Sequence, residues 1–296
     1  MAFDFLSMEK NKKQRIPEWI RVKFSAGGEK EKVFNIIKSK GLHTVCSSAK
    51  CPNLGECWCR GTATFMILGD QCTRNCLFCA VKHSKKPPPP NPSEAEKIAE
   101  AVMELNLRHV VITSVTRDDL PDGGAAIFAK TTLAIKKKSP DVKVELLIPD
   151  FKGNTDALKI VLDAEPDILN HNLETVRRLT PIIRSSADYD RSLKVLSDTF
   201  SISKGKIKVK SGIMLGLGEE DCEIAETICD IRKNGATMLT IGQYLRPGAN
   251  NIKISKFIEP DKFKYWKKFA IELNFMSVWS GPLVRSSYMA EEQNCK

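Results

Sequence analysis

The chain has 296 residues, with 46 Lys and Arg against 36 Asp and Glu, so its net charge is +10 when the four His are neutral. Its 42% hydrophobic and 28% charged residues are ordinary for a globular protein, which excludes disordered, collagen-like and coiled-coil proteins. The length allows one large domain or two small ones, with a core that needs no disulfides.

The sequence predicts a cytoplasmic location. It has no run of about 18 apolar residues, so we expect no membrane span. The first ten residues, MAFDFLSMEK, lack the apolar region of a signal peptide, and their acidic residues fit a transit peptide poorly. Disulfides are rare in the cytoplasm, so the ten cysteines need another explanation.

Seven of the ten cysteines lie between Cys46 and Cys79, a density that indicates metal binding. Apart from Cys59, they form two groups of three. These groups are Cys46, Cys51 and Cys57, followed by Cys72, Cys76 and Cys79. Zinc sites usually take four local ligands, whereas three thiolates leave one iron of a 4Fe–4S cluster open to a further ligand. We therefore favour iron–sulfur clusters over zinc.

The other cysteines have no expected ligand role. Cys59 lies outside both spacings, and Cys295 is the penultimate residue. Cys222 and Cys229 are seven residues apart, so we expect them on the core face of one helix.

After the first cysteine group, β-rich apolar segments alternate with helical ones. The expected strands are Thr62–Leu68, His109–Thr113, Lys143–Ile148, Asp167–Asn170, Ile207–Leu215 and Met238–Gln243. The expected helices are Ser93–Leu105, Gly124–Lys138, Asn154–Asp163, Arg191–Phe200, Asp221–Asn234 and Pro260–Leu273. Ser93 and Glu96 suggest a capping box, and Pro87–Pro92 a stiff connector. Repeated β–α units of this size predict an α/β fold with a parallel sheet, a partial (β/α)6 barrel of TIM type.

Polar motifs follow the expected strands. They are Thr113–Ser114 with Arg117–Asp119, Pro149–Asp150, Asn170–Glu174, Gly216–Glu219 and Gln243–Arg246. In a parallel barrel the carboxyl ends of all strands meet on one rim, where the chemistry takes place. We therefore expect the active site on this rim. His171 lies in one of these motifs, and the sequence leaves open whether its role is structural or in cofactor binding.

The C-x3-C-x2-C spacing, with Phe78 before the last cysteine, resembles the radical S-adenosylmethionine (SAM) superfamily. The resemblance implies that the open iron binds the amino and carboxylate groups of SAM. It also implies that one electron from this cluster cleaves SAM to methionine and a 5′-deoxyadenosyl radical. The spacing by itself indicates three convergent thiolates.

Longer motifs narrow the resemblance to one family. They are CPNLGECW (Cys51–Trp58), GTATFMILGDQCTRNCLFC (Gly61–Cys79), TSVTRDDLPDGGA (Thr113–Ala125), NHNLETV (Asn170–Val176), KSGIMLGLGE (Lys210–Glu219), LTIGQYLRPG (Leu239–Gly248) and GPLVRSSYMA (Gly281–Ala290). In order and spacing they resemble lipoyl synthase from about Gly41 to Ala290. The sequence departs from the usual family pattern at Cys59, Arg178 and Arg246.

The resemblance assigns roles to the cysteines. It implies that Cys46, Cys51 and Cys57 hold an auxiliary 4Fe–4S cluster, which donates sulfur, with Ser287 of the R-S-S-Y motif as fourth ligand. Serine is a harder and weaker ligand than cysteine for such a cluster, which suits a cluster that must be broken. The resemblance also implies that Cys72, Cys76 and Cys79 hold the other cluster, which generates the radical. Candidates for holding the polar groups of SAM are Thr113, Ser114, Asn172, Glu174 and Arg184.

The implied reaction is that of a sulfurtransferase. Two sulfurs enter an octanoyl chain, at C6 and C8, while the chain is linked to a lysine of a lipoyl carrier protein (an H protein or an E2 lipoyl domain). Two SAM molecules are used for each product. Further implied partners are a flavodoxin- or ferredoxin-type electron donor and an iron–sulfur carrier that rebuilds the auxiliary cluster; we expect no nucleic acid or membrane partner, and a monomer.

We expect three regions: an N-terminal extension (1–60) with the auxiliary cysteines, the barrel (61–275), and a C-terminal segment (276–296), the two extensions closing the open face. Residues 1–45 carry a net charge of about +5 and residues 250–296 about +3, which can steer an acidic carrier protein. Two other functions remain open at this point: a radical SAM tRNA methylthiotransferase and a non-enzymatic iron–sulfur cluster carrier.

Overall fold

The computed structural model describes residues 15–21 and 28–294. Its strands are β1 (His43–Thr44), β2 (Thr64–Ile67), β3 (Gln71–Cys72), β4 (Lys82–His83), β5 (His109–Ser114), β6 (Lys143–Leu147), β7 (Ile168–Asn170), β8 (Lys208–Leu215), β9 (Met238–Gln243) and β10 (Ser277–Gly281). Eight of them form one curved sheet in the order β1-β2-β5-β6-β7-β8-β9-β10, and β3 pairs with β4. The pairs from β2 to β10 are parallel, whereas β1 runs antiparallel to β2.

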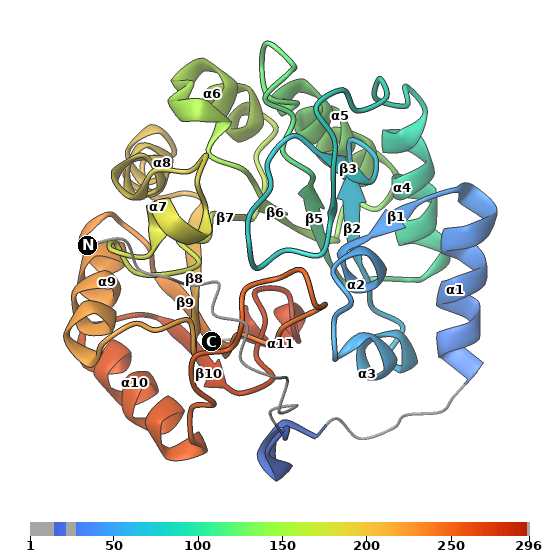
Figure 1. Ribbon diagram of the computed structural model, residues 1–296. Coiled ribbons are helices and arrows are strands. Elements are labelled where there is room, and N and C mark those ends of the chain that lie inside the picture. Colours follow the sequence, from blue (N-terminus) through green and yellow to red (C-terminus); the bar gives the residue numbers. More distant parts are fainter. Residues whose placement is uncertain (1–14, 22–27, 295–296) are drawn as a thin grey trace.

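The outer side of this sheet is covered by α4 (Glu94–Glu104), α5 (Ala125–Lys138), α6 (Thr155–Asp163), α8 (Tyr189–Ile202), α9 (Asp221–Lys233) and α10 (Pro260–Glu272) (Figure 1). The other helices are α1 (Gly28–Lys40), α2 (Val45–Ser48), α3 (Leu54–Cys59), α7 (Thr180–Ile183) and α11 (Ala290–Gln293), with short 3-10 turns η1 (Glu18–Ile20) and η2 (Phe151–Gly153). The six predicted β–α units are all present, and each predicted boundary lies within two residues of the observed one. The partial barrel predicted from sequence is confirmed.

Local signals explain several boundaries. The side chain of Asn154 accepts hydrogen bonds from the amides of Asp156 and Ala157 and so caps α6. Pro260 opens α10, where its missing N–H needs no partner. Gly235 follows α9 with a φ of +90°, a conformation that glycine adopts without strain.

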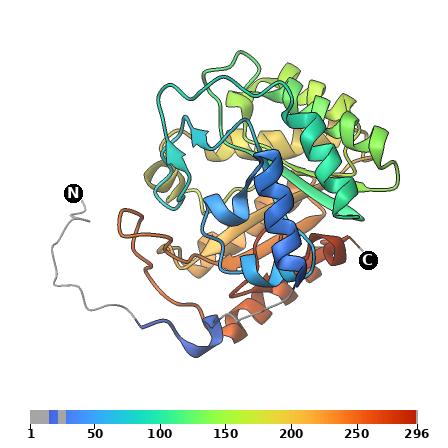
Figure 2. The ribbon, with the colours of Figure 1, turned by 90° about the vertical axis from the view of Figure 1, so that its right-hand side faces the viewer.

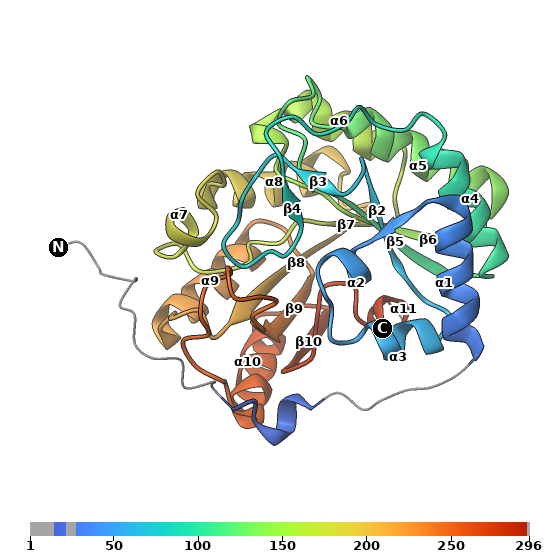
Figure 3. The same ribbon diagram turned by 45° about the vertical axis from the view of Figure 1, so that its right-hand side comes forward.

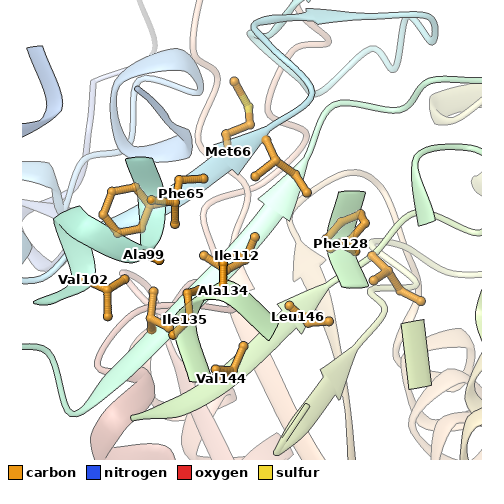
Figure 4. Close-up of a cluster of buried hydrophobic side chains, with 14 of the residues drawn as sticks. Phe65, Met66, Ala99, Val102, Ile112, Phe128, Ala134, Ile135, Val144 and Leu146 are labelled. Atoms are coloured by element: carbon orange, nitrogen blue, oxygen red, sulfur yellow. The ribbon is translucent and has the colours of Figure 1, made fainter. Parts of the chain in front are cut away.

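The main core lies between the sheet and its outer helices. Figure 4 shows one part of it, where Phe65 on β2 and Ile112 on β5 face Ala99 and Ile135 from α4 and α5. These side chains are fully buried. Burying one large apolar side chain contributes about 1.5–3 kcal/mol, so this layer holds the strands that carry the site.

Three sequence expectations were wrong. Ser93 does not cap α4 with its side chain; its amide and hydroxyl donate instead to Oδ1 of Asn91. Cys222 is exposed rather than in the core, because the buried face of α9 is formed by isoleucines and Thr227. The strand β10 was missed, because its sequence SVWSG is short and half polar and gives a weak strand signal.

The two extensions meet across the opening between the sheet edges at β1–β2 and β10 (Figures 2 and 3). Nδ2 of Asn53 donates to the Leu283 carbonyl at 2.7 Å, and the Tyr288 hydroxyl donates to Glu56 at 3.1 Å. Arg60 pairs with Glu292 on α11, which also packs against β5 and β10. The N- and C-terminal segments thus cover the open face together.

Candidate active site

A cavity of about 770 Å³ runs along the inner side of the sheet to the carboxyl ends of its strands. Both predicted ligand groups line it. These residues are Cys46, Cys51, Cys57, Cys72, Cys76, Cys79 and Ser287. Residues that are more than 200 positions apart in sequence are therefore brought to one space.

In the second cysteine group, Cys72 ends β3, and Cys76 and Cys79 lie on the loop between β3 and β4, which charged residues anchor. Arg74 is only 7% exposed. Its guanidinium donates to Asp118 at 2.7 and 2.9 Å and to Asp150 at 2.6 Å, while Arg191 donates to Asp150 at 2.8 Å. Burial acts to raise the pKa of Asp150, but the hydrogen bond and charge of Arg74 hold it well below its ordinary value.

The polar motifs found after the strands therefore have a structural role that sequence reasoning missed. Asp118 and Asp150 anchor Arg74, which lies inside the CTRNCLFC motif. Arg117 pairs with Asp119 and donates to the carbonyls of Leu68 and Pro88. That second anchor fixes the proline-rich connector beside the cysteine loop.

The loop after β9 supports the same cysteines from the other side. Nδ2 of Asn251 donates to the carbonyl of Cys79 at 2.8 Å and to that of Leu77 at 3.2 Å. Arg246 in turn donates to the Asn251 carbonyl at 2.7 Å. Arg246, one of the departures from the family pattern, thus shapes a loop that holds the cysteines.

The first cysteine group is carried by α2, α3 and the turn between them. The amide of Cys51 donates to the Cys46 carbonyl at 3.0 Å, and Thr62 donates to the Cys57 carbonyl at 3.0 Å. Burial, with the nearby thiols Cys46 and Cys51, raises the pKa of Cys57 to about 12. Burial, with the nearby thiols Cys76 and Cys72, raises the pKa of Cys79 to about 12, so both thiols favour the protonated form until a metal displaces the proton.

The donor set fits iron–sulfur clusters better than a lone metal ion. Each group offers three soft thiols to the cavity, and Ser287 adds a hydroxyl. Among residues 15–21 and 28–294, no three His, Cys, Asp or Glu side chains are grouped as ligands of a single ion. A 4Fe–4S cube spreads its ligands over four irons, which suits cysteines distributed around a space.

The five predicted SAM residues all line the cavity, but their side chains are used differently. The Thr113 hydroxyl donates to the Leu147 carbonyl, whereas the buried Ser114 hydroxyl has no partner among the described residues. Asn172 donates to Glu174 at 3.1 Å, and Arg184 donates to the Leu173 carbonyl at 2.8 Å. Burial raises the pKa of Glu174, although the Arg184 charge opposes that shift. Their individual roles stay predictions.

His171 is buried in the cavity wall as a neutral imidazole. Its Nδ1 lies 2.9 Å from the Ile148 carbonyl, and its Nε2 has no partner among the described residues. Burial, with the charge of Arg184, lowers the pKa of His171 to about 4. The imidazole is therefore a hydrogen-bond acceptor toward the cavity at neutral pH.

We expect the stability of the protein to fall as the pH drops from about 6.5 to about 4. The pKa of His171 in the folded protein, about 4, lies below its value of about 6.5 in the unfolded chain. The stability that His171 contributes is therefore fully present above about pH 6.5. It is lost as the pH falls toward about 4, by up to about 1.4 kcal/mol per pH unit. Denaturant unfolding at several pH values measures this slope. A His171→Gln variant should show a shallower slope, and an unchanged slope would contradict the assignment.

Two inward glycines make room for the C-terminal segment. A Cβ on Gly212 of β8 would collide with the Thr240 hydroxyl on β9, and it would also lie 2.9 Å from Oδ1 of Asn172 and 3.2 Å from the Ser286 hydroxyl oxygen. A Cβ on Gly242 of β9 would collide with the Val284 carbonyl oxygen. The motifs KSGIML and TIGQYL therefore include glycines that admit this segment into the barrel.

The matches to known proteins follow this geometry. Residues 66–231 match the radical SAM superfamily. The chain is 51% identical over 282 residues to a lipoyl synthase of Symbiobacterium thermophilum, covering 95% of this chain and 88% of that protein. It is 50% identical over 279 residues to a lipoyl synthase of Treponema denticola, covering 94% and 95%. The chain belongs to the lipoyl synthase family.

Solved structures show the same fold. The FeFe-hydrogenase maturase HydG from Carboxydothermus hydrogenoformans matches with a TM-score of 0.55 at 13% identity, over 72% of this chain and 52% of that one. Streptococcus suis SuiB bound to S-adenosylmethionine matches with a TM-score of 0.53 at 13% identity, over 74% and 51%. At these identities the likeness supports the predicted radical SAM fold alone.

Membership in the lipoyl synthase family confirms three further predictions. The protein is an enzyme of the sulfurtransferase class, its cofactors are SAM and 4Fe–4S clusters, and its reaction belongs to lipoate biosynthesis. The relatives' name favours lipoyl synthase over the methylthiotransferase and the cluster carrier. No helix within the described residues is long and apolar enough to cross a membrane. The cytoplasmic location, the domain boundaries and the monomeric state stay predictions.

Proposed function

We propose that this chain inserts sulfur at C6 and C8 of an octanoyl chain linked to a lysine of a lipoyl carrier protein. The observation that supports this best is the shared cavity, lined by both cysteine groups and Ser287. When bound, the radical SAM cluster with SAM supplies a 5′-deoxyadenosyl radical that removes hydrogen, and the auxiliary cluster supplies sulfur. Unactivated C–H bonds are not acidic, so the reaction needs no general base.

The residues of this chain bind the acyl chain and exclude water from it. Apolar side chains line the inner part of the cavity. They are Met66, Val111, Leu147, Ile213, Met214 and Val284. An octanoyl chain packed against them would be held between the two cysteine groups in few conformations, which favours reaction at defined carbons. A dry pocket also protects a carbon radical from side reactions.

The test of this proposal is anaerobic turnover of an octanoyl-lysine peptide with SAM and a reductant, followed by mass spectrometry. We expect a product that has gained two sulfur atoms, and about eight iron atoms per chain before turnover. About four iron atoms would contradict the two-cluster arrangement. A peptide that gains no sulfur when both clusters are intact would refute the proposed function.

The carrier protein and the other partners follow from the same proposal. The family reaction needs a lipoyl carrier substrate, and we propose an acidic one, with a flavodoxin- or ferredoxin-type electron donor and an iron–sulfur carrier for repair. The basic residues Lys10, Lys12, Lys13 and Lys23 of the N-terminal region lie outside the described residues. Lys32 and Lys38 on α1 are described and exposed.

Charge reversal on α1 tests the acidic carrier. We expect Lys32→Glu with Lys38→Glu to slow turnover of the carrier protein and to flatten its dependence on salt, because steering by surface charge is screened by ions. The rate on a short octanoyl-lysine peptide should stay the same. The matched control reverses two exposed lysines on other helices, Lys137 and Lys159. Equal salt dependence in both variants would contradict the steering role.

A further inference from the structure

Four polar side chains form one layer inside the sheet, across four neighbouring strands. They are His109 on β5, Glu145 on β6, Asn170 on β7 and Lys210 on β8. Glu145, Asn170 and Lys210 are 0% exposed, and His109 is 8% exposed. In barrels of this kind the inner layers are usually filled by branched apolar side chains. A polar layer at this depth therefore calls for a reason beyond filling space.

Hydrogen bonds join the four side chains into one network. Oε1 of Glu145 accepts from Nζ of Lys210 at 2.8 Å and from Nδ2 of Asn170 at 3.1 Å. Oε2 of Glu145 lies 3.2 Å from Nε2 of His109. A buried ion pair seldom adds net stability, because removing both charges from water is unfavourable. The best-supported use of such pairs is to fix one geometry.

One hydrogen bond leaves this network toward the C-terminal segment. Nζ of Lys210 donates to the main-chain carbonyl of Ser286 at 2.7 Å. The Ser286 side chain is held separately, because Nδ2 of Asn172 donates to its hydroxyl at 2.7 Å. Ser286 is thus attached to β8 through its backbone and to the loop after β7 through its side chain. Its neighbour Ser287 lines the cavity.

We propose that Lys210 is a positioning residue, which fixes the main chain at Ser286 and so directs Ser287 toward the auxiliary cysteines. Glu145 holds the Lys210 ammonium in place for this contact, and Asn170 and His109 hold Glu145. The inference rests on the proposed role of Ser287. The effect of Lys210 on how well residues 284–290 are ordered can be measured without enzyme turnover.

The first test is hydrogen exchange on the full-length chain, with and without its clusters. We expect Lys210→Met to speed amide exchange in residues 284–290 by about tenfold or more, since a hydrogen bond to a charged group is lost. The control is Lys143→Met on β6, which removes the exposed Lys143–Asp167 pair at 2.9 Å and should leave that exchange unchanged.

A double variant separates positioning from plain stability. Lys210→Met leaves the Glu145 carboxylate buried without its ammonium partner, which by itself weakens the fold. Lys210→Met with Glu145→Gln removes that unpaired charge and should recover thermal stability. If Lys210 positions Ser286, exchange at residues 284–290 stays fast in the double variant. Recovery of both properties together would overturn the proposal, as would normal exchange in the single variant.

The loaded enzyme supplies a second readout. We expect the double variant to lower the yield of sulfur insertion relative to SAM cleavage and to change the electron paramagnetic resonance signal of the auxiliary cluster. Unchanged values of both would overturn the proposal even if exchange is faster. If the wild-type chain itself adds no sulfur to the peptide, the proposed function fails, whereas the exchange result still decides what Lys210 holds.

Discussion

Replacing Ser287 by Ala is expected to preserve SAM cleavage and to abolish sulfur insertion. The hydroxyl of Ser287 is the predicted fourth ligand of the auxiliary cluster, whereas the cysteines predicted to hold the radical SAM cluster lie separately, on β3 and the loop that follows it. Loss of a ligand group is a larger change than loss of a supporting contact, so we expect the yield to fall by more than about a hundredfold. Mass spectrometry of 5′-deoxyadenosine and of the peptide product measures the two steps separately.

A matched serine on the neighbouring strand provides the control for this variant. The Ser280 hydroxyl on β10 donates to the Phe263 carbonyl at 2.8 Å and is not part of the cavity wall. Ser280→Ala should therefore insert sulfur at the rate of the wild-type chain. Formation of normal lipoyl product by Ser287→Ala would remove Ser287 from the site.

Replacing Arg74 by Met is expected to destabilise the fold and to disorder the radical SAM cysteine loop. The substitution leaves Asp118 without its bidentate partner and Asp150, which is 1% exposed, with Arg191 as its remaining cation. Breaking a buried ion pair by removing one partner costs about 3–5 kcal/mol. Denaturant unfolding measures that loss. The iron content after reconstitution should fall from about eight to about four atoms per chain.

Arg178 provides the control for Arg74. It also makes a bidentate contact, to Glu223 at 2.7 Å, but its side chain is 51% exposed. Exposed ion pairs contribute about 0–1 kcal/mol, so Arg178→Met should change stability little and keep the iron content. Equal losses in the two variants would show that the buried network around Arg74 does not anchor the cysteine loop.

The sequence located the repeating units and the chemistry that they carry. Hydrophobic segments between polar turns are sufficient to place six strands and six helices, because each segment shows its own periodicity. The C-x3-C-x2-C spacing is similarly local, since its three cysteines lie within eight residues of the sequence. The motifs at strand ends were found for the same reason.

Local sequence patterns did not predict contacts between residues that are distant in the chain. Asp118 and Asp150 stood out as motif residues, yet their partner Arg74 is 44 and 76 residues away. The strand β10 forms because β9 offers a partner edge, not because SVWSG is a strong strand sequence. The buried polar layer had a signal in the sequence, because Glu145 and Lys210 are charged residues inside expected strands, but sequence reasoning did not use it.

The sequence by itself determined the fold class, the two cysteine groups and, through its long motifs, the family. Only the tertiary structure decided that both groups share one cavity with Ser287, and that Lys210 reaches the backbone at Ser286. The physical reason is distance along the chain. Spacing within one segment is fixed by local backbone geometry. The contact between β8 and the C-terminal segment depends instead on the arrangement of the whole barrel, and on the absence of a side chain at Gly212 and Gly242.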